Sequence, residues 1–272
     1  MKQNSKKYPK LKFEVHDYEG SKDGEFIWGD NRSEIFERFY EADEISEPDV
    51  ACRELFKIIH DDPEFLDAYN SLGWWEFNAF NYGIALTHFD LAFSIGSKLI
   101  PTDFKGTILW GFLDNRPFLR TMHGLALNHE MIGDYEKADR LCQKILAYNP
   151  NDNQGIRALA IENKLFMGDY QGVLKICKLF PDDTLPDTLF GKVVAHYKLG
   201  QMDRALSTLK EAIKISPNVA IELIKKKHKK IQGEMPGSIT VGGEDEAYDY
   251  WKRTRIVWND PALLDFIKGS LS

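Results

Sequence analysis

The sequence predicts an all-α fold, an α-solenoid of about five helix–turn–helix repeats. The first observation behind this prediction is a pattern shared by four segments and plainest in HYKLGQMDRALSTLKEAIKISPN at 196–218. It consists of a Gly-polar turn, then Ala or Val, then apolar residues three to four apart, often followed by Pro. The second observation is the spacing, because repeats of about 34 residues are typical of paired helices. We place the four copies at 66–99, 119–152, 154–185 and 186–219.

The third observation is that small residues recur in register. Gly73 and Ala126 occupy one position of the first helix of their repeats, and Ala85, Ala138 and Ala205 occupy one position of the second. Where two helices cross closely, only a small side chain leaves room for the facing backbone. We therefore expect the paired helices to contact each other at these small residues.

Turn and stop residues mark the helix ends. Gly133-Asp134 and Gly168-Asp169 supply a residue that can adopt the left-handed conformation and one that can cap the next helix. Pro150 and Pro217 end the second helices, because Pro lacks the N–H and clashes with the preceding turn.

Two divergent units flank these copies. Residues 32–65 predict a terminal repeat, with Ala51 and Pro63 at the small and stop positions but Ser46-Glu47-Pro48 in place of the Gly-Asp turn. Residues 220–231 predict a solvated cap helix, whose last turns hold the lysines of KKKHKK. Clustered cations can mark a site for nucleic acid or anionic lipid. Here their place at a helix C-terminus favours a dipole-stabilising role.

Three segments lie outside the repeat array at 32–231. Residues 1–31 predict an extended N-terminal segment, in which 11–18 alternates like a strand and lies along the array. Residues 100–118 are an insertion too apolar for a free loop, which covers the array or contributes to a site; Asn115 and Pro117 in it predict a helix start. Residues 232–272 predict a connector and two helices that pack on the final repeat and bury Tyr248, Trp251 and Trp258.

The repeats resemble the tetratricopeptide repeat (TPR) family over about half of the chain. LDNRPFLR at 113–120 and NPNDNQGIR at 149–157 are similar to segments of uncharacterised bacterial members. The resemblance implies a right-handed superhelix whose first helices line a concave protein-binding groove. It places in that groove Phe36, Tyr40, Asp43, Asn70, Trp74, Phe77, Asn78, Arg120, His123, Leu127, Glu130, Ala158, Glu162, Leu165, Phe190, Val194, Tyr197 and Lys198.

The groove differs from that of family members that clamp acidic chaperone tails. Trp74, Gly124, Gly155 and Leu159 stand where those members have a Lys, Asn and Arg clamp for two carboxylates. Aromatic side chains with a few polar groups suit an extended segment or a helix with apolar anchors. The insertion or residues 11–28 could also fill this groove.

Composition excludes several classes of function. The net charge is −7, which argues against nucleic-acid binding. No run reaches the roughly 18 apolar residues of a membrane span, and the N-terminal residues have no apolar stretch typical of a secretion signal. Cys52, Cys142 and Cys177 form no CxxC pair and fit a reduced compartment. We therefore expect a cytoplasmic protein.

No constellation of catalytic or metal-ligating residues emerges. There is no Gly-rich phosphate loop, GxSxG elbow or HExxH pair. His123 and His129 are six residues apart, which does not place them on one helical face. Cys142 and Cys177 fall at equivalent inward-facing positions, where Cys acts as a small hydrophobe. We expect no enzyme activity, no metal and no cofactor.

Three functional hypotheses follow. The first is a non-catalytic scaffold that binds a protein or peptide in the groove. The second is a structural protein with a self-filled groove or one that forms homo-oligomers. The third and weakest is an enzyme with a site between the insertion and the array, around Asp114, Arg116 and His123.

Overall fold

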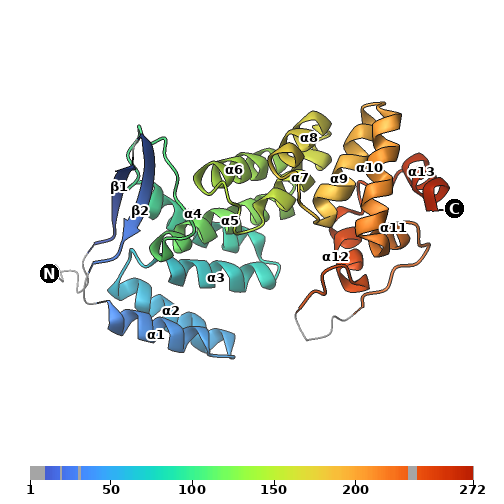
Figure 1. The fold of residues 1–272 in the computed structure, drawn as a ribbon. Helices are drawn as coiled ribbons and strands as arrows, with labels where there is room; N and C mark the ends of the chain where they lie inside the picture. Colours follow the sequence, from blue (N-terminus) through green and yellow to red (C-terminus); the bar gives the residue numbers. More distant parts are fainter. Residues whose placement is uncertain (1–9, 19, 30–31, 232–237, 272) are drawn as a thin grey trace, which may run out of the picture. The chain divides into compact units, whose positions relative to one another are not determined.

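The computed structural model describes residues 10–18, 20–29, 32–231 and 238–271. They form helices joined in antiparallel pairs, together with one β-hairpin (Figure 1). The predicted all-α repeat class is confirmed, with the hairpin as an addition. The helices are α1 (Ser33–Asp43), α2 (Pro48–Asp61), α3 (Leu66–Asn78), α4 (Tyr82–Ser97), α5 (Arg116–Met131), α6 (Tyr135–Tyr148), α7 (Ile156–Phe166), α8 (Tyr170–Leu179), α9 (Pro186–Lys198), α10 (Met202–Ile215), α11 (Pro217–Leu223), α12 (Glu244–Thr254) and α13 (Pro261–Leu271).

The chain divides into two compact units, Met1–Ile156 and Arg157–Ser272. In the first, α1 to α3 enclose a core that includes Ile35, Leu55 and Phe65, each at most 1% exposed. The small residues of the paired helices are buried as expected. A Cβ added at Gly73 would lie 2.7 Å from the ring of Phe89, so this crossing has no room for a side chain.

The turns between paired helices repeat one backbone conformation. Gly133, Gly168 and Gly200 have φ between 71° and 81°, and Asp134 and Asp169 cap the helices that follow two of them. Phe80 holds the same position of the α3–α4 turn with a φ of 63°, although it is not Gly. A bulky residue in this left-handed region is strained.

The described part of the N-terminal segment contains a two-stranded antiparallel hairpin, where the sequence predicted one strand or extended segment. Strand β1 (Lys12–Tyr18) pairs with β2 (Ser21–Ile27), from Lys12 opposite Ile27 to Tyr18 opposite Ser21. Phe26 is fully buried, and its ring lies 4.9 Å from that of Phe118. The hairpin therefore packs on the N-terminal end of α5.

Asn115 joins the hairpin to this helix. Its Oδ1 accepts from the Phe26 N–H at 2.9 Å, and its Nδ2 donates to the carbonyls of Gly24 and Leu109, both at 3.0 Å. The side chain is fully buried. The predicted helix start at Asn115 is confirmed, since α5 begins at Arg116 with Pro117 in its first turn. The helix thus begins inside the predicted insertion 100–118.

The rest of the insertion extends the hairpin. Gly24 N–H donates to the Thr107 carbonyl at 2.7 Å, and Thr107 N–H donates to the Lys22 carbonyl at 2.9 Å. Ile108 is buried, and its N–H donates to the Tyr148 carbonyl at the end of α6. The insertion is thus bonded to the hairpin at Thr107 and to the end of α6 at Ile108.

The predicted cap helix over 220–231 is wrong in extent. Helix α11 ends at Leu223, and the lysines from 225 to 230 lie outside any helix. Five cations in six residues repel one another and offer no apolar stripe to bury. His228 instead turns back: its Nδ1 donates to the Glu222 carboxylate at 2.8 Å, and its ring stacks on that of Trp251 with the ring centroids 3.6 Å apart.

The two C-terminal helices pack on the final repeat, as the sequence predicted. Helix α12 contacts α9 and α11, and α13 contacts α10. Trp258 is 3% exposed, while Tyr248 and Trp251 are half-buried rather than buried. Tyr250, which the sequence did not single out, is the more deeply buried aromatic residue of α12 at 1%.

Candidate protein-binding hollow

The first unit contains a surface hollow of about 520 Å³ between α1, α3 and α5. We call it the α3 hollow, because most of its lining comes from that helix. Six of the predicted groove residues line it: Tyr40, Asp43, Asn70, Trp74, Asn78 and Arg120. The sequence did not single out the other four, Phe39, Asp67, Ser71 and Trp75.

Two carboxylates and one cation set the charge of the α3 hollow. Arg120, 46% exposed, lies 3.3 Å from Asp67, and the Ser71 hydroxyl donates to Asp43 at 3.2 Å. Burial raises the pKa of Asp67, while the nearby Arg120 opposes this shift. The hollow therefore carries more negative than positive charge, and one carboxylate in it is poorly solvated.

Aromatic rings form the floor and rim. Trp74 is half-buried, with its ring 5.4 Å from the rings of Phe77 and Phe89 and 6.3 Å from that of His123. Tyr40 is 60% exposed at the rim. Burial lowers the pKa of His123 to about 4, so this imidazole is neutral at pH 7. Phe77 and His123 thus support Trp74 rather than line the hollow.

Asn70 lines the hollow, but its amide belongs to the contact between α3 and α5. Its Nδ2 donates to the Pro117 carbonyl at 2.9 Å, and its Oδ1 accepts from the Thr121 hydroxyl at 2.8 Å. The side chain is 3% exposed. Among the remaining predicted groove residues of this unit, Phe36, Leu127 and Glu130 are half-buried and lie outside the hollow lining.

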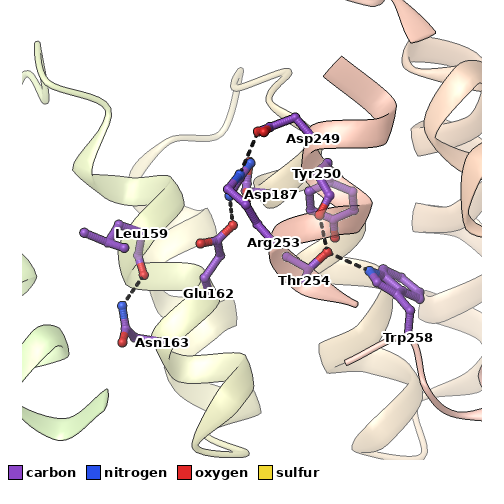
Figure 2. Close-up of polar contacts among 9 residues, drawn as sticks. All are labelled: Leu159, Glu162, Asn163, Asp187, Asp249, Tyr250, Arg253, Thr254 and Trp258. Atoms are coloured by element: carbon purple, nitrogen blue, oxygen red, sulfur yellow. Dashed lines mark hydrogen bonds and ion pairs between the residues drawn. The ribbon is translucent and has the colours of Figure 1, made fainter. Parts of the chain in front are cut away.

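In the second unit the predicted groove residues are covered by the chain itself. Figure 2 shows Arg253 of α12 beside Asp187, Glu162 and Asp249. Its guanidinium donates to both oxygens of Asp187, at 3.1 and 3.3 Å, and to Asp249 at 2.9 Å. Glu162, predicted to face a partner, is 2% exposed and pairs with the same arginine.

Burial dominates the electrostatics of this cluster. Together with the neighbouring carboxylates Asp249 and Asp183, it raises the pKa of Asp187 to about 7. Beside the arginine, Thr254 accepts from the Trp258 indole N–H at 3.1 Å and donates to the Tyr250 carbonyl at 2.6 Å (Figure 2). These bonds fix the turn after α12 and hold Trp258 in place.

The other groove positions of α9 are covered by the same segment. The Phe190 ring lies 6.0 Å from that of Tyr250, and the Tyr197 ring lies 5.2 Å from that of Phe266 in α13. Lys198 pairs with Asp260 at 2.6 Å. Val194 is fully buried and Leu165 is 6% exposed, while Ala158 is half-buried. We call Asp187, Phe190, Tyr197 and Lys198 the α9 face.

Two of the residues suggested for an enzyme site lie far apart. Arg116 and His123 lie seven residues apart on α5, about 10 Å along the helix axis. The Arg116 guanidinium donates to the Trp110 carbonyl at 3.1 Å, and burial raises the pKa of Asp114. Within the described residues no group of three or more His, Cys, Asp and Glu side chains could hold a metal ion.

The family model described as Transcriptional repressor TCF25 matches residues 84–272, more than half of the chain. The chain belongs to the Tcf25 family. The match begins within α4, so it includes the α9 face and Arg120. It does not include the α1 and α3 residues that line the α3 hollow, because these lie before residue 84. The family assignment rests on this match. The resemblance of residues 113–120 and 149–157 to bacterial proteins stays a prediction.

Solved structures give weaker likenesses to this Tcf25 member. YrrB, a TPR protein with an unusual peptide-binding site, is 14% identical, with 79% of this chain and 91% of that chain covered and a TM-score of 0.47. A putative kinesin light chain with TPR-like repeats from Podosopora anserina is 12% identical, with 69% and 97% covered and a TM-score of 0.49. MamA MSR-1 C2 is 14% identical, with 75% and 95% covered and a TM-score of 0.40. No curated protein matched the sequence significantly.

Proposed function

We propose that this Tcf25 family member is a non-catalytic protein-interaction module that binds a peptide or helix of a partner protein in the α3 hollow. The observation that carries the proposal is the lining itself. Exposed Tyr40 and half-buried Trp74 stand beside the carboxylates of Asp43 and Asp67 in a hollow of about 520 Å³. Aromatic anchors with a few polar groups are the usual composition of a protein-binding hot spot.

The family description, which covers residues 84–272, supports a role of the chain in transcriptional repression. On this proposal the chain contributes contacts to a repressor complex and performs no chemistry of its own. In the described residues no helix is long and apolar enough to span a bilayer. A role in transcriptional repression favours a nuclear location over the cytoplasmic one expected from the sequence, and fluorescence microscopy of the tagged full chain in its host distinguishes the two.

A surface variant of the hollow tests the proposal. Trp74→Ala is a poor choice, because the Trp74 ring packs against Phe77 and Phe89 and its loss would disturb the fold. Tyr40→Ala with Asn78→Ala removes two exposed lining residues and leaves the core intact. Phe56→Ala is the matched control, since Phe56 is 52% exposed on α2 outside the hollow.

The measurement is proximity labelling in the native host with quantitative mass spectrometry. We expect partner proteins that label with the wild type and the Phe56→Ala control and lose most of their label with the double variant. Circular dichroism confirms that all three proteins are folded. Equal labelling by all three would contradict binding in the α3 hollow.

A self-associating protein with a filled groove is the second candidate, and the covered α9 face favours it. Sedimentation of the purified chain distinguishes the two. A dimer that the Tyr40→Ala, Asn78→Ala variant converts to a monomer would make a second copy the occupant of the α3 hollow.

A further inference from the structure

The two surfaces of this chain occupy equivalent positions of the repeat. Helices α3 and α9 start at the same point of their repeats, at 66 and 186, and align without a gap. Asp67 therefore corresponds to Asp187. In the same register Asn70, Phe77 and Asn78 correspond to Phe190, Tyr197 and Lys198.

In the second unit, helix α12 of the same chain lies on these positions and shows which side chains pack there. Helix α12 places Arg253 on Asp187 and the Tyr250 ring beside Phe190. The arginine sits among apolar and aromatic residues of one amphipathic helix, so charge and packing act together. This arrangement is a template, within the same chain, for what seats on the first helix of a repeat.

The α3 hollow has the matching chemistry. Asp67 stands at the position of Asp187, Asp43 adds a second carboxylate, and Trp74 and Tyr40 supply the apolar surface. Among the described residues that line the hollow, Arg120 is the one cation, and its pair with Asp67 is long and partly exposed. Because the Asp67–Arg120 contact is long and the arginine is 46% exposed, an incoming cation can share or replace it.

The surroundings strengthen the attraction for a cation. Residues 32–97, which form α1 to α4, contain fourteen Asp and Glu against four Lys and Arg. A negative surface of this kind accelerates the approach of a basic segment and disfavours an acidic one. A cation held over the face of a Trp or Tyr ring gains a further contribution.

We propose that the α3 hollow selects a short amphipathic helix of a partner protein, which presents an arginine or lysine to Asp67 and Asp43 and apolar side chains to Trp74 and Tyr40. The proposal rests on the proposed function and names the chemistry of the partner. It reverses the preference of TPR grooves that clamp acidic tails, because here the protein supplies the carboxylates and the partner supplies the cation.

A selection from random peptides tests this. A phage-displayed library of 16-residue random peptides is selected on the immobilised full chain, with counter-selection on the Tyr40→Ala, Asn78→Ala variant to retain binders that depend on the hollow. We expect these binders to be enriched in Arg or Lys flanked by apolar residues at i±3 or i±4. Synthetic copies should lose at least tenfold in affinity for Asp43→Asn with Asp67→Asn, and should bind more weakly at 0.5 M salt.

Two further variants keep the result interpretable. Asp43→Asn alone changes an exposed side chain, so it preserves the fold even if the half-buried Asp67 does not tolerate change; it should cost at least threefold in affinity. Asp49→Asn, an exposed carboxylate of α2 outside the hollow, should bind as the wild type does.

The outcomes separate this inference from the proposed function. Hollow-dependent peptides without basic enrichment, or with affinity unchanged by Asp43→Asn, would overturn the inference and leave protein binding in place. A total lack of hollow-dependent peptides would overturn both. Peptides that reproduce a segment of this chain would replace the partner helix with a second copy.

Discussion

The α3 hollow and the α9 face lie at equivalent positions of two different repeats, and one is exposed whereas the other is covered. The α9 face is covered by the C-terminal helices, which bury its carboxylate and its aromatic ring. The α3 hollow presents a corresponding carboxylate, with exposed Tyr40 and Asn78 beside it. Repeat register therefore identifies equivalent surfaces, whereas the segments that follow the repeats decide whether such a surface is exposed or covered.

The largest expected effect comes from removing the residue that closes the α9 face. Arg253→Ala leaves Asp187 and Glu162 buried without their cation, at 4% and 2% exposure. We expect a loss of about 3 kcal/mol in the free energy of unfolding, the low end for a broken buried pair because the Arg253 side chain is 39% exposed. Urea unfolding measures this, and hydrogen exchange in α9 should rise as α12 detaches.

The loss should depend on pH. Burial already raises the pKa of Asp187 to about 7, so without Arg253 a proton can neutralise this carboxylate at pH 6 more readily than at pH 8. The variant should therefore be more destabilised at pH 8 than at pH 6. Arg255→Ala, an exposed arginine at the end of the same helix, is the control. Equal stability of the two variants would show that Arg253 does not hold α12 in place.

The α3 side should show a pH dependence of the opposite sign. Burial lowers the pKa of His123 from 6.5 to about 4, so the unfolded chain binds this proton more readily between those values. The free energy of unfolding should fall on the order of 2 kcal/mol as the pH drops from 6.5 to 4, and the contribution is fully present above pH 6.5. His88 and His129 shift in the same direction. The test is the difference between wild type and His123→Gln in urea titrations across this range, and parallel curves would contradict it.

The smallest effect concerns the turn before α4. Phe80→Gly relieves a left-handed backbone that Gly133, Gly168 and Gly200 adopt without strain. We expect a gain of about 0.5–1 kcal/mol, since Phe80 is 77% exposed and loses little burial, while the added freedom of Gly in the unfolded chain offsets part of the relief. Gly133→Ala should instead lose stability by a similar amount. Thermal unfolding compares the two, and a less stable Phe80→Gly would show that the ring itself stabilises the turn.

Sequence alone predicted the features that depend on local spacing. Gly73, Ala85, Ala138 and Ala205 are buried at the helix contacts, because a close crossing admits only small residues wherever it occurs. The same register brought six predicted residues into the α3 hollow. Asp67 could have been found as well, since it lies three residues before Asn70 on the same face of the helix.

What the sequence did not show depends on contacts between distant segments. Nothing in the spacing around Glu162 indicates that Arg253, about ninety residues later, will pair with it. The second strand of the hairpin was missed for a similar reason, because the hydrogen bonds to Phe26 and Gly24 come from Asn115. The lysines of KKKHKK were assigned to a helix because a cap was expected there, while their mutual repulsion favours a non-helical path.

The hydrogen bonds that join Asn115 to Phe26 and Gly24 affect the order in which the chain can fold during synthesis. The residues that Asn115 holds precede it by 89 and 91 positions, whereas a helical repeat completes its own contacts soon after it leaves the ribosome. At 5–20 residues per second, residues 12–27 wait roughly 5–20 seconds for the side chain that fixes them. During that interval the edge of β2 has no partner from the insertion, so the hairpin, although synthesised before the helical repeats, is among the last parts of the first unit to be secured.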